Sequence, residues 1–198
     1  MKKLFAFLAL VLLVNLINAQ SFLSPTGAGA SISAHKMGIF KSFKSDLKDL
    51  EFVDSYSLGK SFGLQLYNSS FLQISFNYVN YAPGTAIISS PTDVFSSSNF
   101  FGLTVGRSIY FGGDKSGMYL NPNIGISYYN FSILSSSVTN HVGAYHSVNL
   151  YIPIELGYKL EFGKSNLCLG FAPNASIGSL GMFSSFGGSV RYAYFFKE

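Results

Sequence analysis

Four side chains of this sequence can carry charge into the interior of a small protein: Glu155, Lys159, Arg191 and His35. Glu155 and Lys159 are four residues apart, so both point to the same side of an extended strand. A carboxylate and a guanidinium at similar depth can pair, because each offsets part of the desolvation cost of the other. We expect Glu155 and Arg191 to pair, with Lys159 and His35 in the same polar cluster. Such a cluster can fill a narrow interior or act as a polar gate for ions.

A serine, a histidine and a carboxylate also occur near one another, at Ser147, His146 and Glu155. Nucleophilic catalysis needs a base beside the nucleophile and an acid that orients the base. Adjacent residues of a strand face opposite ways, so His146 would point away from Ser147 and Glu155. We therefore expect this chain not to be an enzyme.

The sequence offers weak support for metal or cofactor binding. His141 and His146 have no Cys, Asp or Glu close by in the chain to complete a metal site. Gly27 and Gly29 resemble the start of a nucleotide-binding fingerprint, but Ile32 stands where the third glycine belongs. We expect no cofactor and no metal.

The elements that must position these residues show a period of two. From Val148 to Leu160, apolar residues alternate with residues that are mostly polar or small, which is typical of a β-strand. The same alternation predicts eight strands, at roughly 27–38, 56–67, 71–81, 100–111, 118–131, 146–161, 166–177 and 185–196. Each is long enough for the about 9–11 tilted residues with which a strand crosses a bilayer.

The connections between these strands alternate in length. Asn68–Ser70, Gly112–Ser116 and Phe162–Ser165 are short. The other four are longer, at 39–55, 82–99, 132–145 and 178–184. Tight periplasmic turns and longer external loops are typical of outer-membrane barrels. The pattern predicts an all-β, eight-stranded antiparallel transmembrane up-and-down β-barrel with both termini in the periplasm.

The two faces of the strands differ in chemistry. The polar face is mostly Ser, Gly, Asn and Thr, which suits the cramped interior of a narrow barrel. Tyrosines and phenylalanines near the strand ends of the apolar face are expected to form an aromatic girdle at headgroup depth. These residues are Tyr78, Tyr128, Tyr158, Tyr192, Tyr194 and Phe196.

Two kinds of residue break the pattern. Lys60 and Arg107 share the apolar face, near strand ends where long side chains can snorkel out of the lipid. Pro122, Pro153 and Pro173 fall inside predicted strands, and each removes a backbone donor. We expect a local bulge at each proline.

Composition supports the membrane interpretation. Only 11% of the 198 residues are charged, against about 25% in soluble domains, and mean hydropathy is +0.30. After the first twenty residues no run approaches the about 18 apolar residues of a spanning helix. The single cysteine, Cys168, has no partner for an internal disulfide.

The N-terminus resembles a secretory signal. Lys2 and Lys3 precede an apolar run, and Ala19 offers a processing site. We expect residues 1–19 to be a cleaved signal peptide and 20–198 to be the barrel domain. Cleavage leaves 11 of the 13 basic side chains against 9 acidic ones, without the basic stripe that nucleic-acid binding requires.

One strand carries a recognisable motif. Residues 148–159, Val-Asn-Leu-Tyr-Ile-Pro-Ile-Glu-Leu-Gly-Tyr-Lys, resemble a strand of small outer-membrane β-barrels of the Bacteroidetes type, the PorT-like and OmpA-like "porin family" barrels. Gly170–Pro173 and the aromatic strand 188–196 also lie where these families have similar pieces. The resemblance implies an integral protein of the outer membrane of a Gram-negative bacterium, usually without enzymatic activity.

These observations predict a barrel with a side-chain-filled lumen that acts through external loops in envelope structure, adhesion or partner binding. The expected partners are outer-membrane lipid and lipopolysaccharide, the barrel-assembly machinery and an extracellular or envelope protein, but not nucleic acid. Two alternatives remain open: a narrow ion-conducting pore, and an exported soluble lipocalin-like barrel that binds a small apolar ligand.

Overall fold

The computed structural model describes residues 25–43, 58–68, 72–81, 94–95, 98–111, 116–135 and 143–196. The predicted signal peptide, residues 1–19, lies outside the described residues. In the described parts of the chain, no helix has the length and apolar character needed to cross a membrane.

The described residues form one antiparallel sheet. Its strands are β1 (Gly27–Ser42), β2 (Leu58–Tyr67), β3 (Leu72–Tyr81), β4 (Val94–Phe95), β5 (Ser98–Arg107), β6 (Ile109–Phe111), β7 (Ser116–Ser135), β8 (Gly143–Phe162), β9 (Ser165–Phe171), β10 (Asn174–Gly178) and β11 (Gly181–Phe195).

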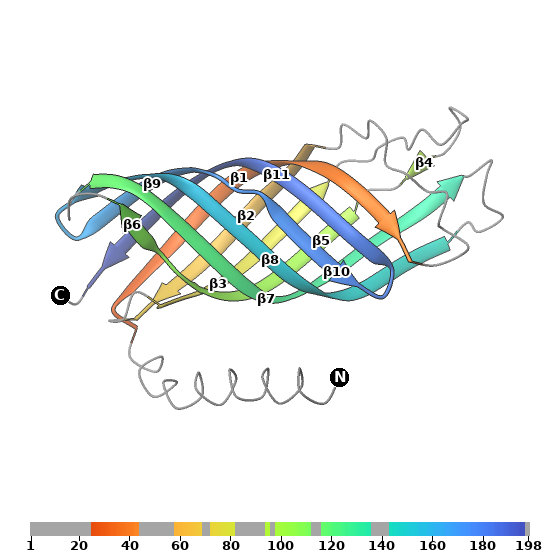
Figure 1. The fold of residues 1–198 in the computed structure, drawn as a ribbon, viewed down its shortest axis with the longest axis horizontal. Helices are drawn as coiled ribbons and strands as arrows, with labels where there is room; N and C mark the ends of the chain where they lie inside the picture. Colours follow the sequence, from red (N-terminus) through yellow and green to blue (C-terminus); the bar gives the residue numbers. More distant parts are fainter. Residues whose placement is uncertain are drawn as a thin grey trace.

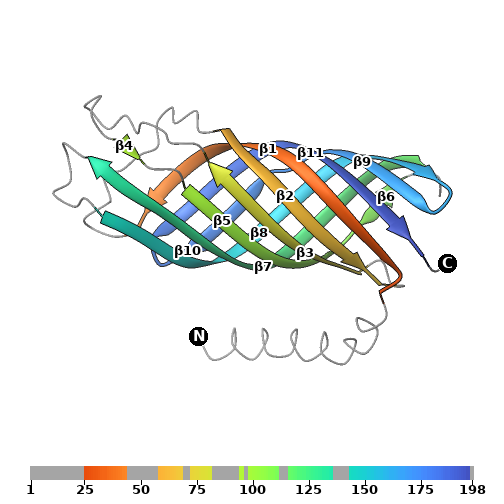
Figure 2. The same ribbon diagram turned by 180° about the vertical axis from the view of Figure 1, so that it is seen from behind.

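This sheet closes into a barrel. β11 pairs with β1, while β8 pairs with β7 on one side and with β9 and β10 on the other. Figure 1 shows the strands crossing obliquely to the long axis of the barrel, and Figure 2 brings β1, β2 and β3 to the front. Closure leaves no long open edge along the wall, which is the condition for a sheet to span lipid.

The wall contains eight strands, as the alternation predicts. β5 and β6 are two parts of one wall strand interrupted at Ser108, and β9 and β10 are two parts of another, interrupted at Ala172 and Pro173. β4 pairs with β7 alone, beyond the end of the β5–β7 ladder, and is not a further full strand of the wall. The fold class is therefore confirmed, and the observed strands extend most of the predicted ones by a few residues.

The two ends of the barrel differ. At one end, which we call the turn end, the chain leaves β2, β6 and β8 and enters β3, β7 and β9, and β11 ends there. Phe196 N donates to Thr26 O over 2.9 Å there, which ties the end of β11 to the start of β1. At the other end, which we call the loop end, the chain leaves β1, β3, β7 and β10 and enters β2, β5, β8 and β11.

The connection between β10 and β11 differs from the predicted one. The sequence predicts a loop over 178–184, but only Ser179 and Leu180 separate β10 from β11. Gly181, with a φ of 152°, lies in a region that other residues rarely adopt and permits the tight connection. Phe183 and Met182 then pair with Phe40 and Lys41 of β1, so a glycine- and serine-rich segment becomes strand because β1 supplies its backbone partners.

The predicted bulges at the prolines are absent from the described ladders. Pro122 pairs with Ile154, and pairing resumes three residues on in both strands, at Gly125 and Tyr151, without a change of register. Register is also unchanged across Pro173. Each proline removes one donor only, and neighbouring bonds such as Ile154 N to Pro173 O, at 2.9 Å, hold the strands in line.

The two faces of the wall are sorted as the alternation predicts. Apolar side chains point outward and are exposed, among them Ile32, Leu64, Leu103, Ile126 and Val148, with 49–66% of their surface accessible. Polar side chains of the opposite parity point inward and are buried. Lys60 and Arg107 are exposed on the outer wall, as expected.

Candidate functional site in the barrel lumen

The inward side chains at the loop end form an aromatic layer. We give this name to Val79, Tyr81, Phe100, Tyr129, Phe131, Tyr151, Leu180 and Phe183, which form one cluster with at most 8% of each residue exposed. The ring centroids of Tyr129 and Phe183 lie 4.6 Å apart, and those of Phe100 and Tyr151 lie 4.7 Å apart. Because these rings come from strands around the barrel, they close the lumen at the loop end.

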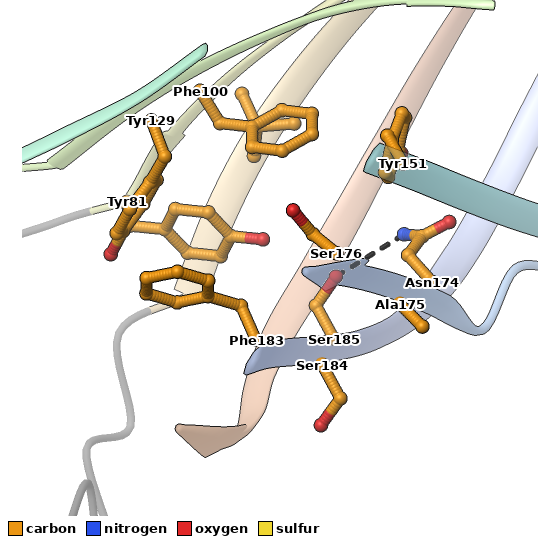
Figure 3. A pocket seen from close by; sticks show the side chains of 11 residues that line it. Tyr81, Phe100, Tyr129, Tyr151, Asn174, Ala175, Ser176, Phe183, Ser184 and Ser185 are labelled. Atoms are coloured by element: carbon orange, nitrogen blue, oxygen red, sulfur yellow. Dashed lines mark hydrogen bonds between the residues drawn. The ribbon is translucent and has the colours of Figure 1, made fainter. Parts of the chain in front are cut away.

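Figure 3 shows side chains of the aromatic layer around a small cavity. Tyr81, Phe100, Tyr129 and Phe183 surround a cavity of ≈ 30 Å³, whose other side is formed by β10 and the start of β11. Asn174 Nδ2 donates to Ser185 Oγ across that side over 3.2 Å. A cavity of this size is far below the volume of about 300–1,000 Å³ typical of small-molecule sites.

Glu155 and Arg191 meet below the aromatic layer, in the middle of the lumen. Arg191 Nη2 lies 3.3 Å from Glu155 Oε2; the Arg191 side chain is buried, and the Glu155 side chain is 13% exposed. Arg191 Nη1 donates to Gln73 Oε1 over 2.8 Å, and Ser189 Oγ donates to Glu155 Oε1 over 2.6 Å. Asn121 Nδ2 donates to the same Gln73 oxygen over 3.2 Å. The structure thus brings together the predicted pair and connects it to strands β3 and β7.

His35 lies in the same cavity as this pair but has its own partners. Its Nε2 is 2.6 Å from Ser33 Oγ, and its Nδ1 is 3.3 Å from Asn174 Nδ2. Ser33 Oγ also contacts Ser61 Oγ. This serine–histidine contact was missed in the sequence, although both residues share one face of β1. Ser33 and His35 both line the polar cavity inside the lumen, below the aromatic layer.

Lys159 faces the lumen as expected but is not part of the central pair. Its Nζ lies 2.9 Å from Glu161 Oε2 and 4.3 Å from the centroid of the Tyr110 ring. Glu161 is two residues further along β8 and therefore on the same face, closer to the turn end. Glu161, two residues along the strand, rather than Glu155, pairs with Lys159.

Tyr119 lies between these two ion pairs and is completely buried. The Arg191 guanidinium carbon is 5.3 Å from the centroid of the Tyr119 ring, close enough for a cation–π contact. The Tyr67 side chain, also buried, packs nearer the turn end with a ring centroid 5.2 Å from that of Phe195. Aromatic rings therefore occupy both ends of the interior.

A polar cavity of ≈ 80 Å³ lies between the two groups of rings. Its lining combines Glu155, Arg191 and His35 with uncharged hydroxyl and amide side chains. The latter include Ser31, Ser33, Ser61, Ser75, Gln65, Gln73, Asn77, Thr104, Asn121 and Asn123.

Other candidate residues remain apart. His146 is exposed on the outer wall and stacks on Tyr128, whereas Ser147 is buried in the lumen, so the serine–histidine–carboxylate arrangement does not form. Among the described residues, no three His, Cys, Asp or Glu side chains are grouped closely enough to hold a metal ion. His141 lies outside the described residues.

The six predicted girdle residues all lie on the outer wall. Tyr158, Tyr192, Tyr194 and Phe196 are exposed near the turn end, and Tyr192 Oη lies 2.8 Å from Ser165 Oγ. Tyr78 and Tyr128 lie nearer the loop end, on either side of Phe101 in the ladder. Their role as a girdle at headgroup depth stays a prediction.

The sequence reasoning missed the aromatic layer. Val79 and Tyr81 continue the parity of Gln73, Ser75 and Asn77, and Tyr129 continues that of Ser127. This parity was the available signal. It is easily overlooked, because the inner face is mostly small and polar and aromatic residues are expected on the lipid side.

Comparison with known proteins supports the fold. No family model and no curated protein matches the chain. Among solved structures, Ail of Yersinia pestis, in complex with the heparin analogue sucrose octasulfate, has a TM-score of 0.54 at 9% identity, covering 85% of this chain and 98% of Ail. Neisserial surface protein A has a TM-score of 0.54 at 12% identity, covering 86% and 97%.

The N-terminal β-barrel domain of Pseudomonas aeruginosa OprF has a TM-score of 0.56 at 10% identity, covering 86% of this chain and 98% of that domain. At such identities the likeness shows the fold, which is that of the small outer-membrane β-barrels. An outer-membrane location fits both this fold and the apolar outer wall. The PorT-like part of the sequence resemblance stays a prediction.

Proposed function

We propose that this chain is an integral protein of a Gram-negative outer membrane, whose barrel is a filled anchor for binding segments outside the cell. The observation that carries this proposal is the closed lumen: the aromatic layer at the loop end and the Glu155–Arg191–Gln73 contacts in the middle occupy the interior. An interior of eight strands has room for side chains and little else. Activity then belongs to the connections at the loop end.

The outer wall supports membrane insertion. Large apolar side chains such as Ile126 and Val148, 60% and 66% exposed, would be unfavourable in water, since each costs about 1.5–3 kcal/mol when not buried. Against acyl chains the same residues are favourable. This arrangement also argues against the soluble lipocalin-like alternative, because such a barrel needs its apolar residues around an internal ligand.

The charges of the loop-end connections indicate which kind of partner surface they can bind. Ail was solved with a sulfated sugar, a polyanion. Here the first loop-end connection and its flanks, residues 39–55, contain three lysines (Lys41, Lys44 and Lys48) and four acidic residues (Asp46, Asp49, Glu51 and Asp54). The connection 82–97 contains a single charged residue, Asp93. This charge balance supports an uncharged or mixed-charge protein surface as partner, with lipopolysaccharide and the assembly machinery as the lipid and folding contacts.

Gel migration of the protein from isolated outer membranes, with and without boiling, tests whether the barrel is a membrane anchor. A closed membrane barrel should stay folded in unboiled SDS and migrate differently after boiling. Release of the protein by carbonate washing, together with complete denaturation in unboiled SDS, would contradict the proposal and favour a soluble exported protein.

Epitope labelling tests the orientation. An epitope inserted between Thr85 and Ala86 should be labelled by antibody on intact cells, while one inserted in the turn at Gly163 should be labelled only after permeabilisation. The opposite result would place the loop end in the periplasm and remove the basis for external binding.

Conductance separates the anchor from the ion-pore alternative. The purified protein in a planar lipid bilayer with KCl on both sides should give no steady single-channel current. A regular current that changes in Glu155→Gln would instead support a pore gated by the central ion pair.

A further inference from the structure

A row of polar side chains crosses the outer wall on five neighbouring strands, from β2 to β8. Each residue of the row is the ladder partner of the next. These residues, which we call the polar row, are Lys60, Asn80, Asn99, Asn130 and His146. The outward residues two positions closer to the turn end, which we call the aromatic line, are Phe62, Tyr78, Phe101 and Tyr128, followed by Val148 on β8. The outer wall therefore changes from apolar to polar along one line.

The asparagines of the polar row present hydrogen-bond donors to the outside. Asn130 Oδ1 accepts from the backbone N of Asn99 over 3.3 Å, so the nitrogen of its amide is the end that is left over. Asn99 Oδ1 accepts from Tyr78 Oη and from Asn80 Nδ2, each over 2.8 Å. The Nδ2 atoms of Asn99 and Asn130 have no hydrogen-bond partner among the described residues, and both side chains are partly exposed.

The charge of this part of the wall is positive. Lys60 is exposed at one end of the polar row, and Lys36 of β1 lies diagonally opposite on the same face. The carboxylates of the described residues, Glu155 and Glu161, belong to the inward face and pair with Arg191 and Lys159. A surface with an ammonium group and amide donors, and without a carboxylate, favours an anion rich in acceptor oxygens, such as a phosphate group.

The register of the wall shows where the polar row lies along the barrel axis. The line of ladder partners that contains the row begins at Leu156 of β8 and passes Phe171, Gly188 and Ala34 before it reaches Lys60. After a full turn it returns to β8 at His146, closer to the loop end. The line therefore climbs toward the loop end, and it becomes polar at Lys60. Because the side chain of Lys60 is long, its ammonium group can reach outward toward Asn80 and Asn99.

We propose that Lys60, Asn99 and Asn130 form a binding site on the outer wall for the phosphorylated headgroup of a lipid. The acyl chains of that lipid lie on the aromatic line. A soluble anion would use the same donors but would gain nothing from the apolar surface beside them, so the arrangement favours an amphiphile. The inference rests on the proposed function in one respect: with the loop end outside the cell, the lipid is lipopolysaccharide of the outer leaflet.

Native mass spectrometry of the folded protein in detergent, titrated with purified lipid A, tests the site. The wild type should retain one lipid A molecule and should retain less of a lipid A from which the phosphates have been removed. Lys60→Met keeps a long side chain but removes the charge, and should weaken lipid A binding by about tenfold, because a charge-assisted hydrogen bond is lost. Arg107→Met is the matched control, since it removes an exposed cation near the turn end. Equal weakening in the two variants, or equal retention of the two lipids, would overturn the proposal.

Asn130→Leu is the second variant, and it decides the question if Lys60→Met does not fold, as judged by migration in unboiled SDS. It removes one amide donor and should also weaken lipid A binding. Complete competition by inorganic phosphate would indicate a site for a soluble anion, and a dimer mass without bound lipid would indicate a second copy of the chain; either result would overturn the proposal.

The measurement in detergent is independent of orientation in the membrane. Folded protein that does not bind lipid A would therefore contradict the lipid site and leave the membrane anchor standing. Retention of lipid A together with a loop end that is not labelled on intact cells would support the lipid site and contradict the external location of the loops.

Discussion

Glu155 of β8 and Arg191 of β11 pair inside the barrel, past the wall strand that separates their own strands, with 3.3 Å between Oε2 and Nη2. Each group also has a hydrogen-bond partner: Ser189 Oγ donates to the Glu155 carboxylate, and Gln73 Oε1 accepts from the Arg191 guanidinium. A buried ion pair contributes little net stability against an apolar replacement, but it makes each partner dependent on the other. The pair therefore fixes how β3, β8 and β11 face one another.

Glu155→Gln should destabilise the barrel, because Arg191 then keeps a buried charge without its carboxylate. We expect a loss of about 3–5 kcal/mol in the free energy of unfolding. Urea unfolding in lipid vesicles followed by far-UV circular dichroism gives this value; the chain has no tryptophan for fluorescence. The double variant Glu155→Gln/Arg191→Met should recover part of the loss. A double variant less stable than Glu155→Gln alone would show that Arg191 is stabilised mainly by Gln73 and Tyr119.

Tyr129→Ala should weaken the aromatic layer, because the Tyr129 ring packs on Phe183 and Phe131 inside the lumen. Removal of a buried aromatic side chain costs about 3–5 kcal/mol, and the same unfolding measurement applies. The adjacent Tyr128 is the matched control, since it points outward and is 39% exposed. Equal losses for Tyr128→Ala and Tyr129→Ala would contradict the assignment of Tyr129 to an interior layer.

Leu103→Arg places a charge in the apolar outer wall. Leu103 lies in the middle of β5 and is 50% exposed, so arginine there should cost about 2–4 kcal/mol if this surface faces acyl chains. Arg107, four residues along the same face and near the turn end, is the control: Arg107→Leu should change stability by less than about 1 kcal/mol. Both are measured in vesicles of one lipid. A tolerated Leu103→Arg would argue that this face is in contact with water.

Gly125→Ala tests a close approach between strands. A Cβ at Gly125 would overlap the backbone oxygen of Leu103 on β5, so the two strands would have to separate. Overpacking of this kind costs about 1–3 kcal/mol. Gly188→Ala is the control, because a Cβ there meets nothing within 4 Å. The prediction fails if both alanine variants unfold at the same urea concentration.

The connection between β10 and β11 shows where sequence reasoning reached its limit. This segment is rich in glycine and serine, at Gly178, Ser179, Gly181 and Ser184. Both residue types occur in loops and at inward positions of barrel strands, and composition alone favours a loop. The backbone of this segment is strand because β1 lies beside it, with Met182 opposite Lys41. This pairing exists only in the closed barrel, so no local segment of the sequence indicates it.

The prolines show a related limit. A proline in a strand predicts a bulge when the strand is considered by itself. In the closed wall, Pro153 lies opposite Asn174 of β10, within a ladder that keeps its register on both sides. Bonds to neighbouring residues outweigh the loss of one donor, and this balance depends on strands that are distant in sequence.

Alternation by itself determined the strand number, the sorting of apolar residues to the outside and the inward placement of Glu155, Arg191, His35 and Lys159, because the direction of a side chain in a strand depends only on parity. The tertiary structure decided how deep each inward residue lies along the barrel axis and which residue it pairs with. Strand tilt and stagger set which inward residues reach the same level, so Arg191 meets Glu155 while Lys159 meets Glu161. The same geometry gathers Tyr81, Tyr129 and Phe183 into one layer and leaves a polar cavity beneath it.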